Sequence, residues 1–425
     1  MKRIIEPKQK VSGQITPPGD KSISHRSVMA GALAEGTTRV KGFLMGADCL
    51  ATVDCFSRLG VEIEANGDFV KVRGRGLYGL KEYGGVLYTV NSGTTTRILS
   101  GILCGQNFPS VIDGDESIRR RPMRRIIEPL RLMNAWISAR EDNFCPLHIN
   151  SSRLKGIDYA LPVASAQLKS CLLFAGLYAD GHTVVREAAK SRDHTELMLK
   201  EFGADIEVFE GGAAIRPSKL APADVEVPGD ISSASYFIVL ALLADEGELL
   251  IKNVGVNPTR TGIIDALKEM GGDIELFNHR MLGREPACDI HVRPSRLKGV
   301  IIEGDIIPRL IDEIPILSVA AARAEGKMVI KGAGELKFKE TNRIKAIAEQ
   351  LGKCGAKFIE TDDGIIIEGE ESLKGAAYNS LGDHRIAMSA AVAAAVAEGP
   401  SEIEGAECVD VSYPGFFEDL ERALD

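Results

Sequence analysis

The chain has 425 residues, which is too long for one ordinary hydrophobic core and predicts two or three domains. Hydrophobic residues make up 44% and charged residues 26%, close to average globular usage, so the composition argues against a disordered chain. The net charge of −9 argues against general binding to nucleic acid or anionic membranes, because that binding depends on many Lys and Arg contacts. An anionic ligand would therefore have to be held by a local group of cations.

The N-terminal residues, MKRIIEPKQKVSG, lead directly into an alternating strand pattern, with no apolar signal region and no long transit segment. No run of about 18 apolar residues occurs that could span a membrane. The eight cysteines are scattered, as expected for small buried side chains in a reducing cytosol, and the seven histidines form no HExxH-like cluster. We therefore expect a cytoplasmic protein without a metal site.

Two distant segments repeat one pattern. Residues 18–43 and residues 228–255 both run from Pro-Gly-Asp through a small polar stretch and an Ala/Leu-rich helix to a Glu-Gly stop and a β-branched strand. A second helix, a Gly-containing turn and another strand follow most such segments, as in LGVEIE and FGADIEV. Four more segments follow the same order with looser spelling, and they begin at Asn91, Val163, Asp312 and Asp383.

Six units of the β-α-β-α-β type, spaced by roughly 70 residues, would account for the whole chain. The alternation of strands and helices predicts an α/β architecture with sheets covered by helices. Because the two Pro-Gly-Asp starts match so closely, we expect a duplicated half-molecule. One domain would comprise residues 19–228, and the other would combine residues 1–18 with residues 229–425.

The first helix of each unit opens with a polar turn, where backbone N–H groups are unpaired and the helix dipole is positive. Several such helix starts meeting between two domains would bind anions. Good N-caps would explain the Ser and Asp residues, but not the cations beside them, although any single cation could equally be a surface charge or a structural ion pair. These cations are Lys21, Arg26, Arg97, Lys169 and Arg385 near first-helix starts, and Arg121, Arg192, Lys339 and Arg343 in the second halves of units.

Two of the helix starts suit an anionic ligand. In KSISHR, Lys21 and Ser22 stand at the helix entrance and Arg26 about one turn deeper. His25 in the same segment is better explained as a hydrogen-bonded structural residue. In NSGTTTR, Gly93 would let a ligand approach the backbone closely, although a helix cap explains this segment nearly as well.

The segment SIRRRPMRR contains five arginines. Arg121, held by Pro122, could donate bidentately to a carboxylate or a phosphate. The alternative of a nucleic-acid patch is weaker, because aromatic residues and a net positive charge are both missing.

Carboxylates stand among the later cations. Glu340 lies in KETNR and Asp383 in DHR, while Asp312 and Glu313 open the fifth helix. A carboxylate surrounded by cations stays ionised and can act as a base, whereas one crowded by other negative charge can act as an acid. For an arbitrary Asp at a helix start, an N-cap role remains the simpler explanation.

In this order, and over essentially the full length, the chain carries the segments GDKSISHR, NSGTTTR, RRRPM, SAQLKS, SRDHTE, DEIP, KETNRI, GDHRIAM and SYPGFF. Together they resemble the 5-enolpyruvylshikimate-3-phosphate synthase family, and SAQLKS and SRDHTE resemble its bacterial class II subgroup. The resemblance implies the enolpyruvyl transferase fold: two similar domains, each an inside-out α/β barrel of three βαβαββ-type repeats, with the active site in the cleft between them.

The resemblance also implies a reaction. The enolpyruvyl group of phosphoenolpyruvate would pass to the 5-hydroxyl of 3-phosphoshikimate through a tetrahedral intermediate, with release of phosphate, in the shikimate pathway to chorismate and aromatic amino acids. No metal and no organic cofactor would be required. We expect a monomer that acts on these small molecules and has no nucleic-acid or membrane partner.

Site residues follow from the matched motifs. The phosphoshikimate contacts would be Lys21, Ser22, Arg26, Ser165, Ala166, Gln167, Arg192, Asp312 and Lys339. The phosphoenolpyruvate contacts would be Lys21, Gly93, Arg121, Gln167, Arg343 and Arg385. Ala166 stands where other members often have serine, so it offers a backbone contact only. Asp312 resembles the base on the hydroxyl, and Glu340 and Lys21 are both candidates to exchange the proton at carbon.

Some relatives carry a lysine just before the motif at residues 412–416, where this chain has Asp410 and Val411, so a cation contact there does not carry over. Gly93 stands where glyphosate would press against the backbone, which predicts a glyphosate-sensitive enzyme. The closest alternative is the sister family acting on UDP-N-acetylglucosamine, which typically has a reactive Cys, sometimes Asp, in a loop ahead of its Arg-Pro. Residues 113–122 contain no Cys, although Asp113 and Asp115 keep this alternative open. A remote alternative is an RNA-binding or RNA-end-processing repeat protein.

Overall fold

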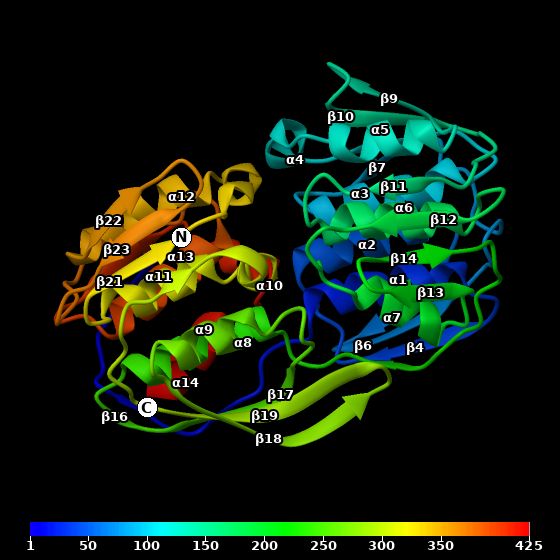
Figure 1. Ribbon diagram of the computed structural model, residues 1–425. Coiled ribbons are helices and arrows are strands. Elements are labelled where there is room, and N and C mark those ends of the chain that lie inside the picture. The colour runs from blue at the N-terminus through cyan, green and yellow to red at the C-terminus, as the bar shows by residue number, and fades with distance from the viewer. Residues whose placement is uncertain (425) are drawn as a thin grey trace. The chain divides into compact units, whose positions relative to one another are not determined.

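The computed structural model describes residues 1–424 and divides into two compact units (Figure 1). Unit 1 comprises Met1–Pro18, Pro228–Met281 and the chain from Pro286 onward, and unit 2 comprises Gly19–Val227 and Leu282–Glu285. The main chain thus passes between the units after Pro18 and after Val227. No sequence signal predicted that the short segment Leu282–Glu285 groups with unit 2.

Unit 2 contains three four-stranded sheets. Their strands are β15 (Val225–Glu226), β4 (Thr37–Lys41), β6 (Phe69–Arg73) and β5 (Glu62–Asn66); β7 (Val86–Tyr88), β8 (Ser110–Asp113), β10 (Phe144–Asn150) and β9 (Trp136–Arg140); and β11 (Asp158–Ala160), β12 (Thr183–Arg186), β14 (Gly212–Ile215) and β13 (Ile206–Phe209), each given in sheet order. In every sheet the first pair is parallel and the other two pairs are antiparallel. Helices connect the first three strands of each βαβαββ repeat and a short loop joins the last two, while in the first sheet the strand β15 comes from the other end of the unit.

The first helices of these repeats form the core of unit 2. They are α1 (Lys21–Leu33), α3 (Gly93–Cys104) and α6 (Ala166–Gly176), and they are buried on nearly every side. A helix that is buried all round belongs in a protein interior, and α3 contacts both α1 and α6. The remaining helices are α2 (Ala47–Arg58), α4 (Glu116–Arg120), α5 (Arg124–Leu132) and α7 (His194–Glu201).

Unit 1 repeats this plan with strands from both ends of the chain. Its sheets are β18 (Asp273–Leu282), β19 (Glu285–Arg293), β17 (Leu249–Gly255) and β3 (Gln14–Ile15); β20 (Ile301–Ile302), β21 (Lys327–Ile330), β23 (Ile365–Glu368) and β22 (Lys357–Glu360); and β24 (Ala377–Asn379), β25 (Ser401–Glu404) and β1 (Lys2–Ile5). A further parallel pair joins β2 (Lys10–Val11) to β16 (Glu246–Gly247). The N-terminal strands β3 and β1 therefore begin the first repeat and complete the last repeat of this unit.

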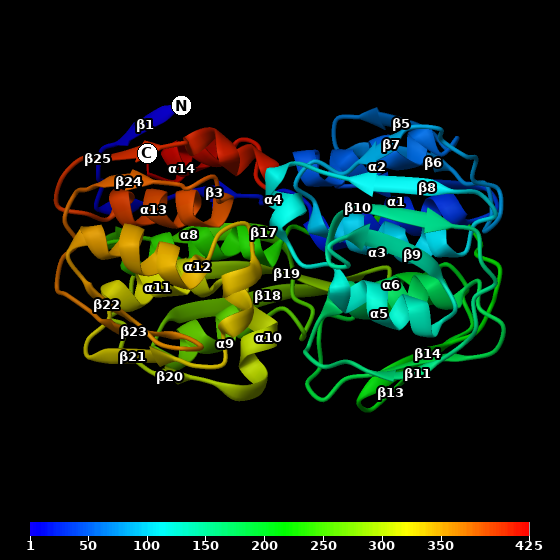
Figure 2. The same cartoon turned by 90° about the horizontal axis from the view of Figure 1, so that it is seen from above.

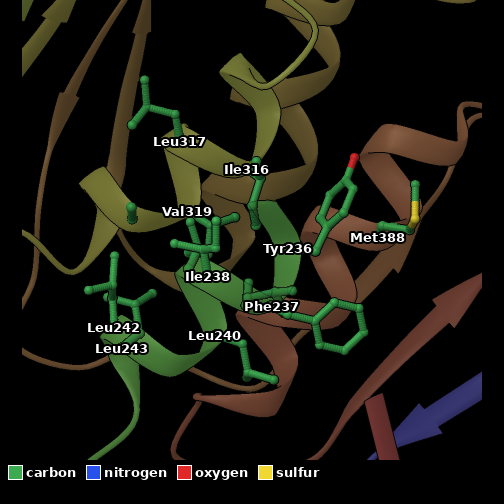
Figure 3. Close-up of a cluster of buried hydrophobic side chains, with 14 of the residues drawn as sticks. Tyr236, Phe237, Ile238, Leu240, Leu242, Leu243, Ile316, Leu317, Val319 and Met388 are labelled. Carbon is green, nitrogen blue, oxygen red and sulfur yellow. The ribbon is translucent and has the colours of Figure 1, made fainter. Parts of the chain in front are cut away.

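The core of unit 1 is likewise built on three helices, α8 (Ile231–Leu243), α11 (Ile314–Ala322) and α13 (His384–Ala395). Every residue of these helices is buried, and the three contact one another. Figure 3 shows Ile238 of α8, Ile316 and Val319 of α11 and Met388 of α13 in this cluster. The other helices are α9 (Gly262–Glu269), α10 (Ile307–Leu310), α12 (Arg343–Ala346), which continues into a π-turn (Ile347–Leu351), and α14 (Phe416–Leu424).

In both units the helices lie inside and the sheets outside (Figure 2). Strands such as β6 alternate buried and exposed side chains, as expected for a sheet with one solvated face. This arrangement is the predicted inside-out α/β barrel. None of the described helices combines the length and the apolar character needed to cross a membrane. The eight cysteines are free thiols, and all except the half-buried Cys408 are buried.

Five of the six core helices begin with a side-chain N-cap, and the caps are Asp20, Ser92, Ser165, Asp230 and Asp383. The two Pro-Gly-Asp starts use the same residue type in the same role. Asp20 accepts from the backbone N–H of Ile23 at 2.9 Å, and Asp230 accepts from that of Ser232 at 2.8 Å. The exception is α11, where Glu313 makes no capping bond.

Candidate active site

In unit 2, Lys21 is the first residue of α1, and Ser22 follows it, half-buried. The Lys21 Nζ donates to Oδ2 of Asp48 at 3.1 Å. Asp48 is the second residue of α2 and is buried, so the carboxylate holds the ammonium group at the entrance of α1. The sequence predicted the lysine but not this partner.

The guanidinium of Arg26 connects three helices of unit 2. Its Nε donates to Thr195 Oγ1 at 2.6 Å, its Nη2 to Ser170 Oγ at 2.8 Å and its Nη1 to the carbonyl of Ser22 at 2.9 Å. All three acceptors are neutral. Burial lowers the pKa of Arg26 to about 10, and the positive charge of Arg192 contributes to this shift. The charge of Arg192, the other arginine predicted to contact 3-phosphoshikimate, therefore acts on Arg26, which remains protonated at neutral pH.

A second connection joins α3 to α6. The Arg97 Nη1 donates to Gln167 Oε1 at 2.7 Å, and Gln167 Nε2 donates to Thr94 Oγ1 at 3.0 Å. The Arg97 Nη2 reaches the carbonyl of Pro122 at 3.2 Å. Arg97 thus orients the predicted ligand residue Gln167 and also holds the backbone directly after Arg121.

Gly93, the first residue of α3, lies directly against two guanidinium groups. A Cβ atom at this position would lie 2.8 Å from Nη1 of Arg97 and 3.1 Å from Cζ of Arg121. Arg121 is buried, and its Nη1 donates to the carbonyl of Asn91 at 3.3 Å. A Cβ atom here would therefore contact both guanidinium groups tightly, and at least that of Arg97 would have to shift.

At the start of α6, Ser165 caps the helix through a 3.4 Å bond from the N–H of Leu168, and Ala166 is the first helical residue. One turn later lies Lys169, one of the cations for which the sequence left an anionic ligand and a structural ion pair equally open. Its side chain is fully buried and pairs with Glu187 at 2.8 Å and Glu196 at 2.7 Å. Lys169 is therefore one of the structural ion pairs that the sequence left open, because the helix turns this position into the core, where it contacts two carboxylates.

His25 is buried, and its Nδ1 lies 2.7 Å from Thr52 Oγ1. Burial holds the pKa of this imidazole well below its usual value, so the ring is neutral. The predicted structural role is confirmed. The bond continues through Thr95 to Ser92, the N-cap of α3, and so links two helix starts.

In unit 1, five charged residues that the sequence analysis singled out form one cluster. The Lys339 Nζ lies 2.9 Å from Asp312 Oδ1, and Arg343 Nη1 lies 3.2 Å from the same oxygen. The Arg343 Nη2 contacts Glu340 Oε2 at 2.5 Å, and its Nε contacts Asp383 Oδ2 at 2.8 Å. The candidate base Asp312 therefore contacts two cations. Asp312 and Glu340, the two carboxylates predicted to transfer protons, both contact Arg343.

Burial and the neighbouring charges oppose each other in this cluster. Burial lowers the pKa of Arg343, but the carboxylates of Asp383 and Glu340 outweigh it, and the pKa is raised. Burial raises the pKa of Asp383, but Arg343 outweighs it, and the pKa falls below its usual value. For Lys339, burial lowers the pKa, and Asp312 offsets this only in part. The cluster is thus strongly ionic, with Lys339 as the cation that loses its proton most readily.

Arg385 lies next to this cluster and is also buried. Its Nη1 lies 3.7 Å from Oε1 of Glu313, a fully buried carboxylate that also accepts a hydrogen bond from Ser232. The Arg260 Nη2 contacts Ser232 Oγ at 2.7 Å and Asp230 Oδ1 at 3.1 Å. The sequence analysis missed Arg260, although it occupies the second half of a repeat, where the other units also carry a cation.

The two aspartates that kept the sister family open have structural partners. Asp113 Oδ2 accepts from Arg119 Nη2 at 2.7 Å, and its Oδ1 accepts from the N–H of Gly114 at 2.9 Å. Asp115 caps α4 by accepting from the N–H of Ile118 at 3.0 Å. Both carboxylates therefore serve the loop that carries Arg121.

Two further predictions concern groups outside these clusters. Among the described residues, no group of three or more His, Cys, Asp or Glu side chains is placed to hold a metal ion. At the C-terminal end, Asp410 is exposed and Val411 is half-buried in the 3₁₀ turn Ala406–Val411. These two residues contribute no cation to either cluster.

The architecture is that of the enolpyruvyl transferases. The crystal structure of the enolpyruvyl transferase NikO from Streptomyces tendae is similar with a TM-score of 0.81 over 99% of this chain and 96% of that chain, and its 17% sequence identity supports the fold alone. The structure of EPSP synthase from Acinetobacter baumannii is similar with a TM-score of 0.88 and 46% identity, over 99% of this chain and 98% of that chain.

Sequence comparison narrows this class to one family. The model of the EPSP synthase (3-phosphoshikimate 1-carboxyvinyltransferase) family matches residues 5–420. A 3-phosphoshikimate 1-carboxyvinyltransferase from Thermoanaerobacter sp. (strain X514) is 55% identical over 414 residues, 97% of this chain and 98% of that protein. One from Citrifermentans bemidjiense is 52% identical over 422 residues, 99% of this chain and 98% of that protein. The chain belongs to the EPSP synthase family.

Proposed function

We propose that this enzyme transfers the enolpyruvyl group of phosphoenolpyruvate to the 5-hydroxyl of 3-phosphoshikimate and releases inorganic phosphate, as a step of the shikimate pathway. Membership of the family and the identity of its relatives support this reaction. The observation that carries it further is the contact of Asp312 with both Lys339 and Arg343. These cations favour the ionised carboxylate, the form in which Asp312 can accept a proton.

Unit 2 supplies groups for the anionic parts of both substrates. Arg26, Arg97 and Arg121 donate hydrogen bonds to hydroxyl, amide and carbonyl oxygens of unit 2. A guanidinium can donate bidentately to a phosphate or a carboxylate. We assign 3-phosphoshikimate to Lys21, Ser22, Arg26, Ser165, Ala166, Gln167, Arg192, Asp312 and Lys339. We assign phosphoenolpyruvate to Lys21, Gly93, Arg121, Gln167, Arg343 and Arg385.

The proposed chemistry balances in two steps. Asp312 accepts the proton of the 5-hydroxyl while the hydroxyl oxygen of 3-phosphoshikimate bonds to C2 of phosphoenolpyruvate. At the same time C3 gains a proton from Glu340 or Lys21, which gives the tetrahedral intermediate. C3 then loses a proton as the C2–O bond to phosphate breaks. Glu340 and Lys21 remain the two candidates for the exchange at C3. The arginines stabilise the negative charge by preorganised electrostatics.

The proposal requires that the clusters of both units act on the same pair of substrates, with the domains and the active site as the sequence predicts them. We further propose that the enzyme works in the cytoplasm. Both substrates are phosphorylated, and moving such charges into an apolar membrane interior is very costly. We also propose that the enzyme acts as a monomer.

The test is phosphate release on mixing the enzyme with phosphoenolpyruvate and either 3-phosphoshikimate or UDP-N-acetylglucosamine. We expect phosphate release from the mixture with 3-phosphoshikimate and none from the mixture with UDP-N-acetylglucosamine. Release with UDP-N-acetylglucosamine alone would overturn the proposal, and so would the absence of release with both. A parallel binding assay with RNA at physiological salt, where we expect no complex, addresses the remote alternative.

A further inference from the structure

We propose that Lys169 and Glu187, two buried residues of unit 2, position Arg192 for the phosphate of 3-phosphoshikimate. This inference rests on the proposed function, because it takes Arg192 as a phosphate contact. In this role Lys169 and Glu187 are positioning residues that act through the backbone of the segment preceding α7. They do not touch the substrate.

Lys169 lies at the centre of a closed network. Its Nζ lies 2.8 Å from Glu187 Oε1, 2.7 Å from Glu196 Oε1 and 3.4 Å from the carbonyl oxygen of Ser191. The lysine side chain is 0% exposed, and both carboxylate side chains are 4% exposed. The second oxygen of Glu187 accepts from both the N–H of Ser191 at 3.0 Å and its Oγ at 2.6 Å. Three of these contacts converge on Ser191.

Ser191 directly precedes Arg192 in a segment without regular secondary structure. Residues 187–193 connect β12 to α7, and their backbone is not held by a helix or a sheet ladder. The conformation of this segment therefore depends on side-chain contacts. Glu187 closes the segment on itself through Ser191, and Lys169 ties both residues to the core helix α6. Arg192 thus leaves the backbone at a point fixed from α6.

The next residue of α6 holds the other side of Arg192. Ser170 Oγ contacts Thr195 Oγ1 at 2.6 Å and also accepts from Arg26 Nη2 at 2.8 Å. Consecutive residues of one rigid helix therefore fix the chain before Arg192, through Ser191, and after it, through Thr195. Because Ser170 also contacts Arg26, the same turn of α6 sets the spacing of the two arginines assigned to the phosphate.

Stability alone does not explain a buried lysine here. Burying an ion pair costs much of the Coulomb energy that the pair gains, and well-packed neutral residues often serve stability equally well. The geometry of the network, which ends on the residue before Arg192, supplies another reason for it. Groups that preorganise a binding residue lower the entropy that the substrate must overcome on binding.

The test replaces the network without leaving a buried charge. In the triple variant Lys169→Met, Glu187→Gln, Glu196→Gln, the shapes are kept and the charges are removed together. We expect KM for 3-phosphoshikimate to rise about tenfold, with kcat and KM for phosphoenolpyruvate changed less than about twofold. Lys200→Met, an exposed lysine of α7, is the matched control and should leave every constant unchanged.

The decisive measurement is the same triple change in an Arg192→Gln background. If the network acts through Arg192, the triple change should raise KM for 3-phosphoshikimate by less than about twofold in the Arg192→Gln background. An equal rise in both backgrounds would overturn the inference and leave the proposed function intact. An unchanged KM in Arg192→Gln alone would also overturn it. If the triple variant is unfolded, the milder Glu187→Gln replaces it in the same cycle, with the same expected split. Failure of the proposed function has a separate signature, since the unmodified enzyme would then release no phosphate with 3-phosphoshikimate.

Discussion

The two units share one fold but surround their arginines differently. In unit 2, Arg26 and Arg97 donate to neutral oxygens of Thr195, Ser170 and Gln167. In unit 1, the cations of the cluster contact carboxylates: Arg343 forms ion pairs with Asp312, Glu340 and Asp383. The same repeat therefore gives Arg26 and Arg97 hydroxyl and amide acceptors in one unit, and gives Arg343 carboxylate partners in the other.

This difference indicates that the two units have different roles. Cations with neutral partners keep their charge available for anionic ligands, which suits the binding of phosphates and carboxylates. Carboxylates held between cations are suited to proton transfer, because small changes around them alter which group holds the proton. We expect substitutions in unit 1 to affect kcat most and substitutions in unit 2 to affect KM most.

The largest expected effect is in unit 1. Asp312→Asn keeps the shape of the side chain but removes its ability to accept a proton. We expect kcat to fall by about 10³-fold, within the range for loss of a general base, while both substrates still bind. Single-turnover kinetics with a separate binding titration would measure the two effects. Turnover close to that of the unmodified enzyme would remove Asp312 as the base and weaken the comparison.

The next effect is in unit 2. Gly93→Ala places a methyl group against the guanidinium groups of Arg97 and Arg121 and displaces them. We expect kcat/KM for phosphoenolpyruvate to fall by about tenfold, because a shift of a few tenths of an ångström should cost less than the roughly 10²-fold loss for a 1 Å misplacement. Gly84→Ala is the matched control, because a Cβ atom there meets nothing within 4 Å. Equal effects of both substitutions would contradict the assignment of Arg121.

The same site predicts inhibition by an analogue. Glyphosate carries a carboxylate and a phosphonate, and we expect it to compete with phosphoenolpyruvate beside Gly93. Saturating glyphosate at low phosphoenolpyruvate should abolish turnover, and a rising concentration of phosphoenolpyruvate should restore it. Unchanged turnover in a steady-state assay under these conditions would show that the enzyme is insensitive.

The buried ion pair of Asp383 with Arg343 in unit 1 predicts that the stability of the protein depends on pH. The pKa of Asp383 lies below 3.8 in the folded protein, so the unfolded chain binds this proton first, and the stabilisation is lost as the pH falls through the folded pKa. Asp383→Asn should lower stability by about 3 kcal/mol near neutral pH, because Arg343 loses a buried partner. It should also flatten the decline in stability below pH 3.8. Thermal unfolding from neutral to acidic pH tests both effects.

The smallest effect is a shift in a pH profile. Burial lowers the pKa of Lys339 below 10.5, so in the free enzyme this cation is lost at a lower pH than an exposed lysine would be. We expect kcat/KM for 3-phosphoshikimate to decline as the pH rises through the lowered pKa of Lys339. Lys339→Arg keeps its charge and should move the decline to higher pH. An identical profile for both proteins would assign the decline to another group.

Particular residues show how far the sequence could lead. The matched Pro-Gly-Asp starts correctly predicted two equivalent capped helices at Asp20 and Asp230, because capping depends on a few adjacent residues. The cluster of Asp312, Lys339 and Arg343 was anticipated as a list of residues, but not as contacts. For Lys169 the sequence could not decide between an anionic ligand and an ion pair, because its carboxylate partners come from the segment between β12 and α7 and from α7 itself.

The sequence by itself determined the repeat, the βαβαββ order, the helix caps and the residue types that suit two polyanionic substrates. These features depend on local spacing and on backbone chemistry that neighbouring residues control. Only the tertiary structure decided which cations have neutral partners and which have carboxylate partners. That distinction depends on which segments, distant in the sequence, pack around each side chain. Burial among these segments influences both the charge state and the orientation of the side chain.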